Sequence, residues 1–175
     1  MVEALSLNGS NGISFWLSQP NYNTTDPIEG SVLLDVGSVP ATGLTLFLKG
    51  VDELTIWKPH LKRNRMYFKK ETFETQFAKV RLSLKNFEKQ CTPQGKTSYP
   101  FQMILPADLP PSTFCKSAKV KSLQAKVRYF LVAEITGGAE NLTHQHEVTL
   151  TKPMDEQKQA TFATENKVGG YFGVG

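Results

Sequence analysis

Hydrophobic residues alternate with polar ones along most of the chain. Ile13, Phe15 and Leu17 are spaced two apart, and residues 32–36 repeat the pattern. A period of two is typical of a β-strand with one buried face, whereas helical spacing of three or four is weak throughout. The same pattern predicts further strands at residues 44–57, 77–84, 99–105, 127–135 and 147–151. About seven strands separated by Gly- and Pro-containing turns predict an all-β fold, an antiparallel β-sandwich.

Two places interrupt this alternation. Gly50 lies inside the strand expected at residues 44–57, where a glycine often marks a bulge or a bend, so the range predicts one bent strand or two. Residues 116–126 could form a short helical turn, although the flanking segments resemble strands. Neither interruption changes the predicted fold class.

The segment YPFQMILPADLPPSTF, residues 99–114, combines alternation with three prolines. Its first half predicts a strand whose core-facing side chains are Tyr99, Phe101, Met103 and Leu105. The prolines cannot donate ladder hydrogen bonds, so they should end the strand and stiffen a crossing between sheets. We expect Leu109 and Phe114 to pack beneath that crossing.

Length and composition fit one ordinary globular domain. The chain has 175 residues, 39% of them hydrophobic, and residues 1–153 hold all the expected strands. Residues 154–175 are polar and then Gly-rich, which predicts a linker or the start of a second, absent domain. No apolar stretch approaches the roughly 20 residues of a membrane span, and no basic region opens a signal peptide. With only two cysteines, Cys91 and Cys115, a cytoplasmic location is expected.

Few residues suggest catalysis or a cofactor. His144 and His146 would share one strand face, a geometry that metals accept, but no third ligand follows from spacing. Cys91 has lysines nearby and Cys115 follows the proline segment, yet no histidine is close in sequence to either. The sequence shows no glycine-rich phosphate loop, no serine elbow and no paired carboxylates on a helix. We therefore expect no enzyme, no metal site and no cofactor.

Positive charge gathers in one stretch. Residues 58–70, KPHLKRNRMYFKK, contain six cations and no acid, so the other residues together are net acidic. The candidate site for an acidic or phosphorylated partner comprises Lys58, Lys62, Arg63, Arg65, Lys69 and Lys70. The alternatives are a solvated hairpin loop, an anionic lipid site or a nucleic-acid site, the last disfavoured by the small overall charge. A second basic stretch, residues 116–128, would join the first if the two lie close together.

Four segments in order resemble a known family. DPIEGSVLLDV, LTLFLKGVDELTIW, YPFQMILPADLPPSTF and AKVRYFLVAEI are similar, over about residues 13–151, to the N-terminal domain of arrestin-fold proteins. The last three look most like the α-arrestin (arrestin-domain-containing) branch. The resemblance implies an immunoglobulin-like β-sandwich with no catalytic site. It also implies an adaptor that binds membrane cargo or receptor proteins and links them to trafficking, endocytic or ubiquitination machinery.

Two departures limit what the resemblance implies. Receptor-binding arrestins sense phosphate through adjacent lysines on the first strand, and GISFWLSQ has none. α-Arrestins recruit ubiquitin ligases through Pro-Pro-x-Tyr motifs, and Pro110-Pro111-Ser112-Thr113 lacks the tyrosine. The leading hypothesis is a cytoplasmic scaffold, peripheral at the plasma membrane or endosomes, that binds proteins at a sandwich face or sheet edge. The alternative is a membrane-surface or nucleic-acid binder acting through charge alone.

Overall fold

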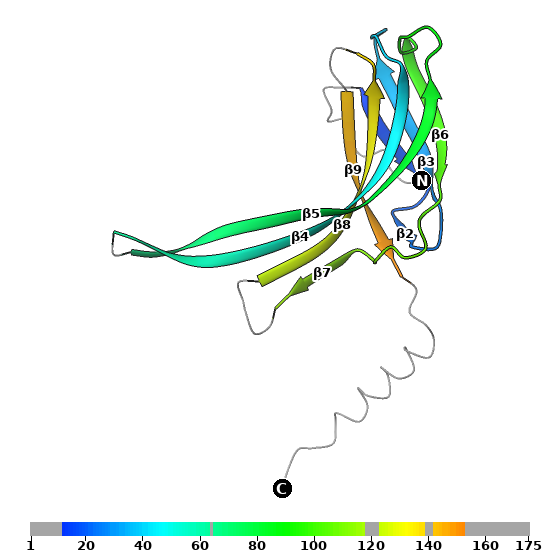
Figure 1. The fold of residues 1–175 in the computed structure, drawn as a ribbon. Helices are drawn as coiled ribbons and strands as arrows, with labels where there is room; N and C mark the ends of the chain where they lie inside the picture. Colours follow the sequence, from blue (N-terminus) through cyan, green and yellow to red (C-terminus); the bar gives the residue numbers. More distant parts are fainter. Residues whose placement is uncertain (1–11, 64, 118–122, 139–141, 153–175) are drawn as a thin grey trace, which may run out of the picture.

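The chain folds as an all-β structure in the computed structural model, which describes residues 12–63, 65–117, 123–138 and 142–152 (Figure 1). These ranges contain nine strands: β1 (Ile13–Leu17), β2 (Asn21–Asn23), β3 (Ile28–Val36), β4 (Gly43–Lys62), β5 (Arg65–Asn86), β6 (Gly95–Met103), β7 (Thr113–Lys116), β8 (Leu123–Thr136) and β9 (Leu142–Thr151). Within these ranges no residue is helical. The short helical turn considered for residues 116–126 is wrong where it can be checked, because Lys116 pairs with Gln124 in a sheet.

The strands form two sheets. One has the order β1-β3-β6, and the other has the order β2-β9-β8-β4-β5 with β7 paired to β8. The antiparallel sandwich expected from the alternation is confirmed, with one exception: β2 runs parallel to β9. The three residues of β2 are too few to show a period, and so neither the strand nor its direction was expected.

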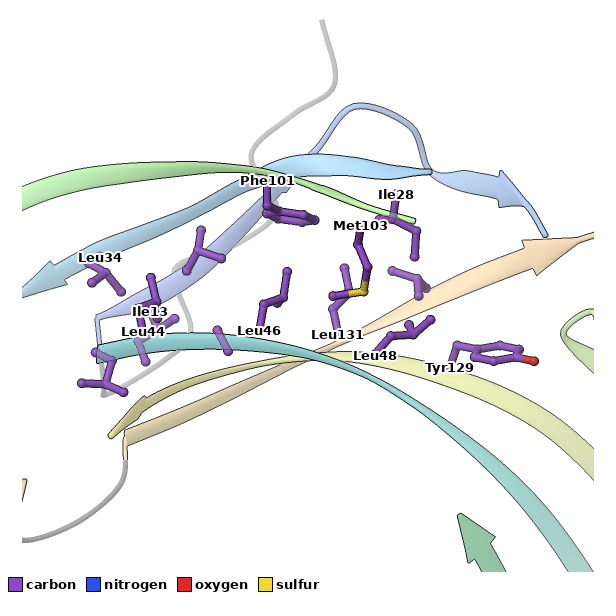
Figure 2. Close-up of a cluster of buried hydrophobic side chains, with 14 of the residues drawn as sticks. Ile13, Ile28, Leu34, Leu44, Leu46, Leu48, Phe101, Met103, Tyr129 and Leu131 are labelled. Carbon is purple, nitrogen blue, oxygen red and sulfur yellow. The ribbon is translucent and has the colours of Figure 1, made fainter. Parts of the chain in front are cut away.

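Side chains from both sheets fill the space between them (Figure 2). Buried positions alternate with exposed ones along β3, and in β6 Phe101 and Met103 are buried while Tyr99 is partly buried. Leu105, just beyond β6, also packs against this core. The expected core face of this segment is therefore confirmed. The facing sheet contributes side chains with at most 2% exposure, among them Leu44, Leu46, Leu48, Tyr129, Leu131 and Leu150.

The proline segment after β6 crosses from one sheet to the other. The Tyr129 hydroxyl donates a hydrogen bond of 2.6 Å to the carbonyl of Pro110. The Ser112 amide donates to the Leu150 carbonyl at 2.7 Å, and the Leu150 amide donates to the Ser112 hydroxyl at 3.0 Å. Leu109 is buried beneath the crossing, as expected.

Phe114 does not pack beneath the crossing. It lies on β7, opposite Lys126 of β8, and its side chain is 60% exposed. The Lys126 ammonium lies 5.7 Å from the ring centroid. The expectation for Phe114 is wrong because β7 adds to the sheet where β8 extends past the sandwich.

β4 and β5 continue past the sandwich as a long projection (Figure 1). We call residues 51–62 and 65–76 the hairpin arm. The pairing of β4 with β5 shifts register between Gly50 and Val51, which confirms the expected bulge in one bent strand. The backbone of Gly50 also passes close to Phe77, because a Cβ at residue 50 would lie 2.7 Å from Cζ of that ring.

The projection makes both strands longer than the sequence indicated. β5 begins at Arg65 instead of residue 77, and β4 continues to Lys62 instead of ending at Trp57. Residues 58–62 and 65–70 are therefore paired strand and not loop. Their cations are exposed to solvent, as the solvated-hairpin alternative expected. Alternating burial could not reveal these extensions, because both faces of the distal strands are exposed.

Candidate functional site

The distal part of the hairpin arm is a two-stranded ribbon. Within the described ranges, β8 accompanies β4 only as far as Ile56, so residues 57–62 and 65–70 pair only with each other. The cross-strand pairs run from Trp57 opposite Lys70 to Lys62 opposite Arg65. Arg63, with φ 50°, lies in the turn. Because successive side chains point to opposite faces of a strand, this register defines two different faces.

One face, which we call the basic face, carries most of the charge. Its cross-strand pairs are Lys58 with Lys69, His60 with Tyr67, and Lys62 with Arg65. The rings of His60 and Tyr67 stack with their centroids 5.6 Å apart. This stack separates the two pairs of cations along the ribbon.

One carboxylate lies at the inner end of the basic face. Lys58 Nζ is 2.7 Å from an oxygen of Glu71, and Lys69 Nζ is 4.0 Å from the other oxygen. The hydrogen bond from Lys58 lowers the pKa of Glu71 below its ordinary value. Glu71 therefore stays ionised and partly offsets these two lysines.

The other four predicted cations have no such partner among the described residues. In the part of the chain that the structure describes, no ion pair within 4.0 Å involves Lys62, Arg63, Arg65 or Lys70. All four residues are exposed. The six predicted site residues thus share one arm, although Arg63 lies in the turn and Lys70 lies on the opposite face.

The opposite face, which we call the apolar face, carries five neutral side chains beside Lys70. They are Trp57, Pro59, Leu61, Met66 and Phe68. The exposed fractions are 39% for Trp57, 73% for Leu61, 71% for Met66 and 62% for Phe68. Soluble monomers seldom expose such a contiguous apolar surface without using it.

The sequence interpretation missed the apolar face. Residues 57–62 do alternate between neutral and basic side chains in strict period two, WKPHLK, with His60 in a basic position. Treating the segment as a loop concealed this signal. The alternation shows a second face once β4 is known to continue to Lys62.

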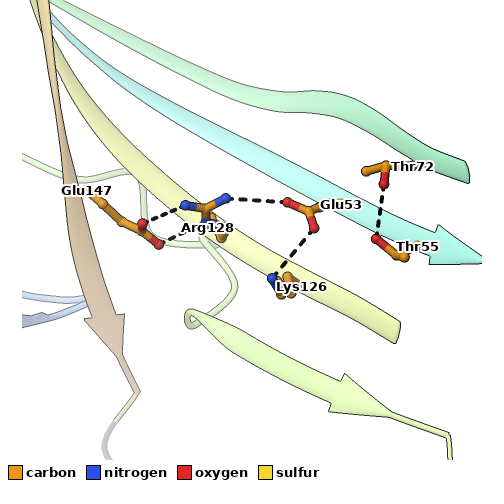
Figure 3. Close-up of polar contacts among 6 residues, drawn as sticks. All are labelled: Glu53, Thr55, Thr72, Lys126, Arg128 and Glu147. Carbon is orange, nitrogen blue, oxygen red and sulfur yellow. Dashed lines mark hydrogen bonds and ion pairs between the residues drawn. The ribbon is translucent and has the colours of Figure 1, made fainter. Parts of the chain in front are cut away.

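In the described part of the second basic stretch, Lys126 and Arg128 do not join the basic face. Lys126 and Arg128 lie at the base of the hairpin arm, where both contact Glu53 (Figure 3). Arg128 also binds Glu147 through two hydrogen bonds of 2.9 and 2.6 Å. These bonds lower the pKa of Glu147 and raise that of Arg128. The two cations therefore tie β8 to β4 and β9, while residues 118–122 lie outside the described ranges.

The remaining candidates form no reactive cluster. His144 and His146 share a strand face, as expected, and their rings lie 5.8 and 6.0 Å from that of Phe15. Burial lowers the pKa of His146, and His144 adds to this effect. Cys91 is partly buried and Cys115 is exposed, and both are free thiols. Among the described residues no three His, Cys, Asp or Glu side chains gather in a way that could hold a metal ion.

Comparison with known proteins identifies the family. The model of the arrestin (or S-antigen) N-terminal domain matches residues 13–157. The chain belongs to this family. The arrestin-like sandwich is an adaptor or scaffold fold whose members are generally not enzymes. Assignment of this arrestin domain to the α-arrestin branch stays a prediction.

Other comparisons are more distant. The solved structure of Spo0M, a sporulation control protein from Bacillus subtilis, has 16% sequence identity and a TM-score of 0.49, covering 90% of this chain. The match covers 56% of the Spo0M chain, so the present chain spans little more than half the length of that protein. No curated protein sequence matches the chain. No helix in the described ranges is long and apolar enough to cross a membrane.

Proposed function

We propose that this arrestin domain is a non-enzymatic adaptor that binds membrane cargo or receptor proteins on the cytoplasmic side of the plasma membrane or endosomes. The basic face takes an acidic or phosphorylated segment of the partner. The observation that carries this proposal is the group of cations on a projecting ribbon, four of them without a neighbouring carboxylate in the described ranges. Charge-assisted hydrogen bonds from Lys and Arg suit carboxylates and phosphates alike.

The shape of the ribbon supports a peptide ligand. The cations of the basic face occur in cross-strand pairs on both sides of the His60–Tyr67 stack. An extended segment with charges two residues apart has a similar repeat, because alternate side chains of an extended chain recur every 6–7 Å or so. Several weak ion pairs could therefore form together, each contributing roughly 0.2–1 kcal/mol at this exposure.

A charge-reversal variant tests the proposal. The triple variant K62E/R65E/K69E changes three exposed positions on the basic face, and K85E/K89E/K96E makes the same charge change on exposed lysines outside the hairpin arm. Binding would be measured by fluorescence anisotropy with a labelled peptide that alternates glutamate and phosphoserine. Loss of three ion pairs plus the new repulsion should weaken binding at least about tenfold for the first variant. The second variant should bind within about twofold of the parent.

Two comparison ligands separate the proposal from attraction by charge alone. The same peptide with unphosphorylated serine should bind more weakly, and a single-stranded oligonucleotide of equal charge should bind more weakly than the phosphopeptide. Equal binding of oligonucleotide and phosphopeptide, with the same steep loss in salt, would indicate a charge-only binder and refute the adaptor site. Equal loss of binding in both triple variants would also refute it.

A further inference from the structure

The apolar face has no role in the proposed function. Leu61, Met66 and Phe68 are each more than three-fifths exposed, although all belong to regular paired strand. Burying one such side chain fully is worth about 1.5–3 kcal/mol. A surface of this kind on a ribbon that extends from the body of the protein indicates an apolar environment beyond the described residues.

Charge is segregated along the hairpin arm. Residues 57–70 hold six cations and no acid, whereas residues 51–56 and 71–76 hold Asp52, Glu53, Glu71 and Glu74 and no cation. The apolar face ends at the same boundary, because the next cross-strand pair inward is Thr55 with Thr72, whose hydroxyls lie 3.3 Å apart. The distal six residues of each strand therefore form one unit, about 20 Å long at ordinary strand rise.

We propose that the distal hairpin arm inserts its apolar face into the interface of a membrane that contains anionic lipids. In this orientation Leu61, Met66 and Phe68 enter the boundary between headgroups and acyl chains. The lysines and arginines extend to lipid phosphates and carboxylates, as on amphipathic interfacial helices. Trp57 lies at the inner end of the apolar face, at headgroup depth, where indole rings are favoured.

Charge favours this occupant over a second copy of the chain. Two hairpin arms stacked through their apolar faces would bring twelve cations together, and Lys70 lies on that face beside Trp57. An anionic bilayer instead attracts each nearby cation by about 1 kcal/mol. All six cations of the hairpin arm lie in its distal half, so this attraction brings the tip to the surface first.

Tryptophan fluorescence tests the insertion directly, because the chain has two tryptophans. W16F leaves Trp57 as the sole indole, and W57F leaves Trp16, which is half exposed on the other sheet. The full chain would be mixed with vesicles of phosphatidylcholine and phosphatidylserine at about 70:30, or of phosphatidylcholine alone. Emission of Trp57 should shift to shorter wavelength with the mixed vesicles, while emission of Trp16 should not. No shift of Trp57 on bound protein would overturn the proposal.

A matched pair of variants tests the energetics by vesicle flotation. L61T/M66T/F68T retains every cation and the strand preference of the hairpin, and it should lower partition into the mixed vesicles about tenfold or more. The control L33T/I104T removes exposed apolar side chains elsewhere, 39% and 79% exposed, and should change partition less than twofold. Circular dichroism of each variant should match the parent, because none of these side chains is in the core.

The possible outcomes separate this inference from the proposed function. The triple Thr variant should still bind the phosphoserine peptide, because it keeps the basic face intact. Equal partition of parent and triple variant, abolished by salt, would show attraction by charge alone and overturn the insertion. The insertion would also be overturned if the parent did not bind vesicles and the triple Thr variant lost a protein partner that the parent binds. The apolar face would then be a protein-docking surface. Failure of the peptide assay alone would leave the insertion intact.

Discussion

Substitution of Gly50 by alanine should strain the point where the hairpin arm leaves the sandwich. The added Cβ would lie 2.7 and 2.9 Å from Cζ and Cε2 of Phe77 and 3.0 Å from Cε1 of Tyr129. Tyr129 is fully buried, so it has little room to move, whereas Phe77 is 37% exposed. If Phe77 swings outward, it loses its edge-on contact with Tyr129 at 5.7 Å, worth roughly 0.5–1.5 kcal/mol.

The expected cost of G50A is therefore about 1–3 kcal/mol of unfolding free energy. Urea denaturation followed by circular dichroism measures this cost directly, and each kcal/mol should lower Tm by about 2–4 °C for a chain of this size. Gly37 offers a matched control, because nothing lies within 4 Å of a Cβ at that position. G37A should be neutral, or stabilising by up to about 1 kcal/mol through the unfolded chain.

A double-mutant cycle identifies the source of the strain. Two of the three closest atoms belong to Phe77, so G50A should cost only about half as much in an F77A background. An unchanged cost in that background would refute the role given to Phe77. Stability of G50A equal to that of the parent would refute the close packing itself.

Three further predictions concern the sandwich. Y129F removes the donor to the Pro110 carbonyl and should cost about 1–3 kcal/mol in urea denaturation; a cost below about 0.5 kcal/mol would contradict the role of this bond. Burial lowers the pKa of His146 below 6.5 in the folded protein, so on acidification this histidine is protonated in the unfolded chain before it is protonated in the folded one. The free energy of unfolding should therefore decrease as pH drops through 6.5. H146Q should flatten that part of the pH profile, and an unchanged profile would exclude His146 as its cause. L109A should cost about 2–4 kcal/mol and F114A less than about 0.5 kcal/mol, whereas equal costs would place Phe114 beneath the crossing after all.

Alternation was a reliable guide wherever one strand face is buried. Residues 32–36 and 99–103 show hydrophobic side chains at every second position, and these positions are the ones that fill the core. The bulge at Gly50 was also predictable, because glycine inside a strand allows the close approach of another group that Phe77 makes. These features depend on local periodicity and local backbone freedom.

The candidate site was only partly predictable. The six cations were evident from composition, and their presence on one hairpin could be anticipated. Which of these cations lie on the basic face, in the turn or on the apolar face is known only from the cross-strand register, which places Lys58 opposite Lys69 and Trp57 opposite Lys70. The register of two strands that are exposed on both faces cannot be predicted from the sequence, because no alternation of buried and exposed positions marks it.

The amino-acid sequence by itself determined the all-β class, the core strands and the location of the positive charge, because each is set by side chains near one another in the chain. Only the tertiary structure decided that the hairpin arm projects from the sandwich, that Lys126 and Arg128 bind Glu53, and that Phe114 is exposed. Each of these depends on which strands pair at long range. β8 continues past the sandwich beside β4, with β7 paired to its other edge. In the described ranges this support ends at Ile56, so the distal half of the hairpin arm is a two-stranded ribbon with two different faces.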